Sequence, residues 1–297
     1  MQNDSGFFRL SRCFYVLVLF SLLIFSCKKY ETVTEPNNTP PPDYTVDEVK
    51  VENYVNKSFI TLIGREPSTA ELGFYKQNLL VANFSMAERK EFLQDVIKLP
   101  DYLTHTYTVF LAELLNNQDT TDISLMISVF GILLNDTTYA PFWSIIQEEQ
   151  NRLIDFQKFN NEWAVGNKRV DELHRMMVDN YFYDQINMGS LNYVISVFQH
   201  FLLRNPSNSE ETSCVTMIDG QSALLFGQLG KSKKDFNDIF FNSDDYFEGQ
   251  VRKYFLRYYF REPDNAEMIK YTKDLKTYKD FTKFQSDILA ENEFAGI

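Results

Sequence analysis

The chain has 297 residues, a formal net charge of −12 and an aromatic content of 15%. Because a chain this acidic repels phosphate backbones and anionic lipid, we expect no nucleic-acid partner. Only one of its three cysteines, Cys214, lies beyond residue 27, which excludes an intramolecular disulfide in the body and leaves stability to a hydrophobic core.

Residues 1–26 resemble a bacterial lipoprotein signal peptide. Two arginines precede a mostly apolar run of thirteen residues that ends at Phe25. In a helix this run spans about 20 Å, which is short for a hydrocarbon core of ~30 Å. The boundary Ile24-Phe-Ser-Cys27 resembles a lipobox, which implies cleavage before Cys27, acylation of that cysteine and attachment to a bilayer. Lys28 implies sorting to the outer membrane of a Gram-negative cell. An ordinary secretory signal or an uncleaved anchor is the alternative.

Residues 27–45 combine the lipidated cysteine with a proline-rich tether. Pro36 and the run Pro40-Pro41-Pro42 disfavour a helix and favour an extended spacer. About 17 residues at ~3.1 Å each would hold the body up to ~50 Å from the lipid.

One pattern, Arg-x-Pro-(Ser/Asp)-x-x-Glu, then occurs three times. Its arginine, proline and glutamate are Arg65, Pro67 and Glu71 in the first copy, Arg204, Pro206 and Glu210 in the second, and Arg261, Pro263 and Glu267 in the third. The proline predicts the end of one helix, the Ser or Asp caps the next, and the Glu completes a capping box. We therefore expect these residues to be structural.

Further positions agree between the copies. Upstream of each arginine, apolar residues recur at −10, −6, −3 and −2, which is one face of a helix. Downstream, each copy has a phenylalanine followed nine residues later by an acid: Asp101, Asp245 and Glu293. This acid could pair with the repeated arginine.

A fourth, degenerate copy is predicted between the first and second. It places Asn117 at the arginine and Asp119 at the proline, and it could end at Tyr183. The fold class is therefore all-α, with tandem helical repeats in a bundle or short solenoid of ten to fourteen helices. The predicted repeats are residues 46–104, 105–188 (degenerate), 189–247 and 248–297. We expect a β-like run at Cys214–Thr216 and a helix at 222–226.

Two segments carry the closest likeness to a known family. Residues 59–72 (Phe-x-x-Leu-Ile-Gly-Arg-x-Pro-Ser-x-x-Glu-Leu) and 92–102 (Phe-Leu-x-x-Val-Ile-x-x-Pro-x-Tyr) resemble the phycobilisome-linker-like helical repeats of bacterial surface proteins. The resemblance implies a helical fold and an association with cell surfaces. It implies no reaction.

The sequence contains few candidate residues for catalysis or metal binding. The histidines, His105, His174 and His200, lack metal-ligand spacing, and we expect no metal and no organic cofactor. Gly230-Lys231-Ser232 lacks the first glycine of a phosphate-binding loop. Asp119-Thr-Thr and Asp136-Thr-Thr resemble O-glycosylation acceptors.

We therefore expect a non-enzymatic, outer-membrane-anchored lipoprotein that acts as a scaffold or adaptor for another envelope component. The alternative is a glycan-binding lipoprotein of a nutrient-uptake system. An enzyme is a third possibility for which no residue stands out. Surface contacts are expected in residues 105–190, where the pattern decays and both tryptophans, Trp143 and Trp163, occur.

The lipidation prediction is directly measurable. Mass spectrometry of the mature protein should show an acylated peptide that begins at Cys27, and Cys27→Ala should leave the precursor unprocessed. An unmodified mature terminus at another residue would contradict the lipobox interpretation.

Overall fold

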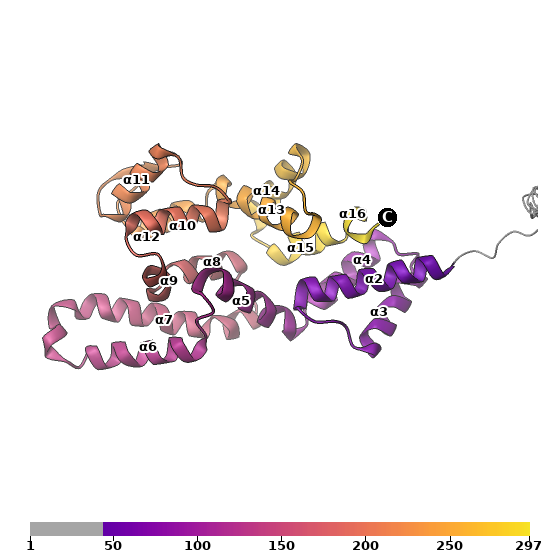
Figure 1. The fold of residues 1–297 in the computed structure, drawn as a ribbon, viewed down its shortest axis with the longest axis horizontal. Helices are drawn as coiled ribbons and strands as arrows, with labels where there is room; N and C mark the ends of the chain where they lie inside the picture. The colour runs from indigo at the N-terminus through magenta and orange to yellow at the C-terminus, as the bar shows by residue number, and fades with distance from the viewer. Residues whose placement is uncertain (1–43) are drawn as a thin grey trace, which may run out of the picture. The chain divides into compact units, whose positions relative to one another are not determined.

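The computed structural model describes residues 44–297, so the predictions for the signal peptide, Cys27 and nearly all of the tether lie outside the described residues. Those residues form fifteen α-helices, one 3-10 helix and one two-stranded sheet (Figure 1). The all-α prediction is confirmed. The helices outnumber the predicted ten to fourteen because two of them, α9 and α16, are short, with only six and four residues.

The elements follow the chain in this order. They are α2 (Tyr44–Ile63), α3 (Thr69–Val81), α4 (Met86–Ile97), α5 (Pro100–Leu115), α6 (Thr120–Leu133), η1 (Thr137–Phe142), α7 (Trp143–Ala164), α8 (Val170–Val178), α9 (Tyr181–Ile186), α10 (Ser190–Leu202), α11 (Asn208–Ile218), β1 (Ala223–Leu225), β2 (Gln228–Gly230), α12 (Lys233–Phe240), α13 (Asp244–Tyr259), α14 (Asn265–Tyr278), α15 (Phe281–Leu289) and α16 (Asn292–Ala295).

Each Arg-x-Pro junction separates two helices as the pattern predicts. Ser68, Ser207 and Asp264 cap α3, α11 and α14, and the glutamate three residues on completes a capping box each time. The residue before each arginine is left-handed: Gly64 (φ 72°), Leu203 (φ 57°) and Phe260 (φ 57°). This conformation ends the preceding helix.

The apolar helix face predicted upstream of the arginines is the core. The valines at −10 and the phenylalanines at −6 are at most 1% exposed in all three copies: Val55, Val194, Val251, Phe59, Phe198 and Phe255. The helix period therefore brings one large aromatic and one branched residue per copy into a common interior.

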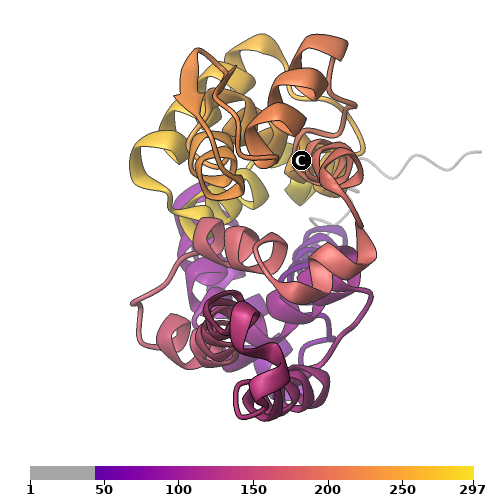
Figure 2. The same cartoon turned by 90° about the vertical axis from the view of Figure 1, so that its left-hand side faces the viewer.

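The first and last helices of the described chain contact each other. The Tyr54 hydroxyl on α2 donates to the Leu289 carbonyl on α15 (3.1 Å). The fully buried Arg89 on α4 donates to the Ala290 carbonyl (2.8 Å) and to Asn292 Oδ1 (2.6 Å). In Figures 1 and 2 the segments up to α8 lie largely below those from α10 onward. The helices thus close on themselves around one core.

The region after α11 differs from the prediction. Cys214–Thr216 belong to helix α11, whereas 222–226, predicted helical, enter a β-hairpin in which Leu225 pairs with Gln228. Its two turn residues, Phe226 and Gly227, both have positive φ (48° and 77°), as a tight hairpin turn requires. Gly230 is structural, because a Cβ there would lie 2.7 Å from Met217 Sδ.

The degenerate junction is one residue shorter than the others. Asn116 and Asn117 are both left-handed, and Asp119 caps α6. The left-handed residue that ends the preceding helix lies three residues before the N-cap here (Asn116 and Asp119). At the first junction it lies four residues before the N-cap (Gly64 and Ser68). Asp119 therefore occupies the capping position, and its predicted place at the proline is wrong.

Core and capping residues should rank differently in stability. Phe255→Ala should lower the free energy of unfolding by ~3–5 kcal/mol because the ring is 1% exposed. Asp264→Ala should cost ~1 kcal/mol as a lost N-cap, and Pro263→Ala should have the smallest effect. Chemical denaturation measures all three. Phe260→Ala is the matched control, because that ring is 87% exposed. A loss at Phe260 equal to that at Phe255 would contradict the core assignment.

Candidate functional site

Each repeated arginine joins three helices. Arg65 bonds both oxygens of Glu71 on α3 (2.9 Å each) and, through Nε, Asp101 on α5 (2.9 Å). Its guanidinium lies 5.5 Å from the ring centre of Phe59 on α2, the helix it terminates. Sequence separation from arginine to the second acid is 36 residues here.

The other two junctions repeat this geometry. Arg204 bonds Glu210 (2.7 and 2.8 Å) and Asp245 (3.0 Å). Arg261 bonds Glu267 (2.8 Å twice) and Glu293 (2.5 and 2.8 Å). All nine predicted junction residues thus lie at helix junctions. Both carboxylates already occupy each guanidinium, so these arginines act between helices and leave little capacity for a ligand.

The paired charges shift each other's pKa. The Arg65 guanidinium is the main cause that lowers the pKa of Glu71 to about 2, and Arg204 does the same for Glu210. In the degenerate copy both the arginine and its second acid are absent. Asn117 stands in place of the arginine. If this copy ends at Tyr183, Leu173 stands in place of the repeated phenylalanine, and Phe182, nine residues later, stands in place of the acid. Losing both together leaves no unpaired charge.

His174 and Cys214 are fully buried, whereas His105 and His200 are half-buried. His174 is fully buried, its Nδ1 lies 2.8 Å from the Tyr246 hydroxyl, and burial holds its pKa well below the usual value. His200 contacts Tyr183 (2.9 Å). Burial raises the pKa of Cys214 to about 12, so its thiol is unreactive. Within residues 44–297, no group of three or more His, Cys, Asp or Glu side chains could hold a metal ion.

The helical hairpin formed by α6, η1 and α7, at the lower left of Figure 1, has an exposed surface that is apolar and nearly uncharged. Residues 123–147 contain a single charged side chain, Asp136, in a chain that is 24% charged. Exposed apolar side chains come from all three elements: Leu125 (63%) and Ile132 (69%), Tyr139 (39%) and Phe142 (56%), and Ile145 (60%). We call residues 132–145 the hairpin tip.

Hydropathy singles out the same hairpin. In residues 44–297, no single helix is long and apolar enough to cross a membrane. One pair, Thr120–Leu133 with Thr137–Ala164, reaches the required length and composition only when taken together, and it is bent by 106°.

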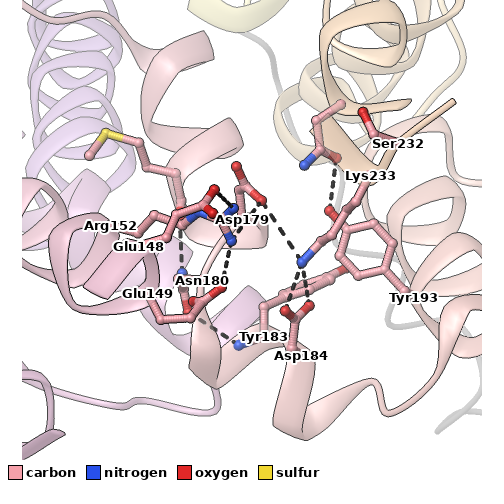
Figure 3. Close-up of polar contacts among 12 residues, drawn as sticks. Glu148, Glu149, Arg152, Asp179, Asn180, Tyr183, Asp184, Tyr193, Ser232 and Lys233 are labelled. Atoms are coloured by element: carbon pink, nitrogen blue, oxygen red, sulfur yellow. Dashed lines mark hydrogen bonds and ion pairs between the residues drawn. The ribbon is translucent and has the colours of Figure 1, made fainter. Parts of the chain in front are cut away.

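A mixed-charge cluster attaches this hairpin to neighbouring helices (Figure 3). Arg152 on α7 bonds Glu148 and Glu149 (2.6 Å each) and reaches Asp179 at the end of α8 (3.8 Å). Asp179 is also 3.8 Å from Lys233 on α12. The same lysine bonds both oxygens of Asp184 on α9 (2.6 and 2.7 Å). The network therefore links α7, α8, α9 and α12.

Two carboxyl groups of this cluster take up protons more readily than usual. Burial raises the pKa of Glu149 and of Asp184, although Arg152 and Lys233 oppose the shifts. Glu149 Oε2 is buried without a hydrogen-bond partner. Of the two adjacent acids, Glu148 belongs to the exposed acidic surface (66% exposed), whereas Glu149 is only 20% exposed. The sequence signal that could have indicated these ion pairs is the spacing of Glu148 and Glu149 to Arg152, four and three residues along one helix.

The tryptophans and the Asp-Thr-Thr motifs have local roles. Trp163 is 7% exposed and lies in the core, and the indole N–H of Trp143 donates to the Leu133 carbonyl (3.1 Å) across the hairpin. Asp119 and Asp136 cap α6 and η1. Neither tryptophan offers a free ring face with an unpaired indole N–H.

Comparison with known proteins adds no relative: no protein-family model, no curated protein and no solved structure matches this chain.

The lowered pKa values predict an acid-sensitive fold. The carboxyl pKa of Glu71 and Glu210 is about 2 in the folded chain, against an ordinary value of 4.5 for a glutamate in water. Their contribution to stability is thus complete above pH ~4.5 and is lost as pH falls toward ~2. Denaturation between pH 2 and 6 should show this slope, and Arg204→Ala should flatten it.

The control is Arg252→Ala, which removes a surface arginine whose ion-pair partner among residues 44–297 is Glu262. A slope that Arg204→Ala and Arg252→Ala change equally would contradict the special role of the junctions.

Proposed function

We propose that this protein is a lipid-anchored, non-enzymatic scaffold of the outer membrane, which binds another envelope component through the hairpin tip. Acylated Cys27 would attach it to the bilayer, and residues 28–43 would separate the anchor from the helical body. The observation that carries the proposal is the exposed, nearly uncharged apolar surface of residues 132–145.

Exposed apolar area of this kind supports a binding role. Large apolar side chains that remain in water on a folded chain commonly mark an interaction site. Contact cores are also poor in charge and rich in aromatic residues, and Tyr139 and Phe142 fit that composition. The charged cluster around Arg152 supports the proposal further, because it fixes α7 to three other helices and so presents the tip in one orientation.

Glycan binding stays the alternative to this function, without an observation that favours it. Sugar sites commonly use an aromatic face beside free hydrogen-bonding groups, whereas Trp163 is buried and the Trp143 N–H is occupied.

Binding to isolated envelopes tests the proposal. The chain from residue 28 lacks the anchor but keeps every described residue, and it should sediment saturably with cell envelopes that lack their own copy. Phe142→Ser combined with Ile145→Ser should reduce the bound fraction about tenfold or more, since two exposed apolar side chains are lost from the contact.

Ile269→Ser on α14 is the matched control, because Ile269 is 71% exposed and lies outside the hairpin. Circular dichroism should show that each variant keeps its helices. Binding that the tip variant retains in full, or that the Ile269 variant loses equally, would contradict the proposal.

A further inference from the structure

We propose that the envelope component bound by the hairpin tip is the bilayer itself, specifically the interface of neutral, zwitterionic lipid. This inference rests on the function proposed above and names the partner. It follows from which apolar side chains are exposed and from how charge is distributed around them.

The first observation is the continuous exposure of the tip. Every residue from 135 to 142 is exposed, and large apolar side chains project from α6 (Ile132), η1 (Phe142) and α7 (Ile145). A protein partner needs one complementary face, and the rest of such a tip would stay in water. A fluid apolar medium can contact all of these side chains at once.

The second observation is the distribution of charge. No Lys or Arg occurs between Lys98 and Arg152, and Asp136 is the only charge from 123 to 147. A near-absence of charge lowers the cost of entering the interface. The absence of basic residues also removes the attraction that draws most peripheral proteins to anionic lipid. The preferred surface is therefore neutral, and its binding should depend little on salt.

The third observation limits the depth. The Asp136 carboxylate, which caps η1 through the Thr138 N–H (2.9 Å), is charged, and a charge is costly to bury in hydrocarbon. The tip therefore enters only to the headgroup and upper acyl region. Tyr139 and Trp143 are suited to that depth, because aromatic rings with a polar edge concentrate at membrane interfaces.

A lipid anchor makes such a shallow contact effective. A single weak insertion is reversible alone, but a second attachment on the same chain raises its local concentration. In Figure 1 the tip lies far from the start of α2, where residues 28–43 join the body. If residues 28–43 form the extended tether expected from their prolines, with a reach of up to ~50 Å, the anchor would leave the tip free to meet either its own bilayer or a facing one.

Protein-free vesicles test the inference. The chain from residue 28 should float with phosphatidylcholine vesicles, and its fluorescence should shift to the blue and be quenched by lipids labelled at a shallow acyl position. Trp143→Phe should remove the quenching, because Trp163 is buried in the core. Ile132→Ser combined with Phe142→Ser should weaken partitioning about tenfold or more, whereas Ile269→Ser should not.

Each other outcome has a defined meaning. No flotation, flotation that the tip variant retains, or binding that requires phosphatidylglycerol and disappears at 0.5 M salt (roughly a 4–5 Å screening length) would overturn the inference. If envelopes bind the chain while pure vesicles do not, the tip binds a protein or glycan and the proposed scaffold function stands. If neither binds, both proposals fail.

Discussion

The structure depends on the bridge that each repeated arginine makes between two carboxylates. A guanidinium presents its donors in one plane, so Arg65 can hold Glu71 from the next helix and Asp101 from a helix 36 residues further along the chain. The buried ring of Phe59, whose centre lies 5.5 Å from the guanidinium, continues this arrangement into the core. Half-exposed ion pairs stabilise a fold only modestly. Their larger effect is geometric, because the bridge fixes the relative directions of three helices while the buried aromatic residues supply the free energy.

The second copy lacks the arginine–carboxylate bridge, and this is where the chain departs from the repeated helix pattern. With Asn117 and Phe182 in place of the pair, the second copy has no such link between its helices. There the chain adds η1 and the 22-residue helix α7, and the cluster of Arg152, Asp179 and Lys233 supplies the attachment instead. The element that carries the proposed binding surface thus occupies the place where the junction geometry no longer constrains the chain.

What the sequence could predict follows from the range of each interaction. Capping boxes and helix faces depend on residues within about ten positions, so Ser68, Glu71 and Val55 were assigned from the pattern alone. The acid at +9 was suggested only because three copies repeated it. The contact of Arg89 with Asn292 and the cluster around Lys233 join residues 49 or more positions apart without any repeated signal, so no local pattern indicates them.

Two local errors had a different cause. Residues 222–226, which form the first half of the hairpin, were predicted as helix because their apolar run is short, and runs of that length suit a strand equally well. Its turn is set by positive φ at Phe226, which is rare for a bulky residue. The loss of one residue at the degenerate junction shifted Asp119 from the expected place to the N-cap, since an alignment by side-chain type does not detect a shorter turn.

The central claim is that the hairpin tip is the binding surface in the cell. Site-specific photo-crosslinking measures this most directly, with a photoreactive phenylalanine analogue at Phe142 and, for comparison, at Ile269 on α14. The account predicts adducts with lipid or another envelope component from position 142 and none above background from position 269. Equal adducts from both positions, or none from position 142 in correctly localised protein, would contradict it.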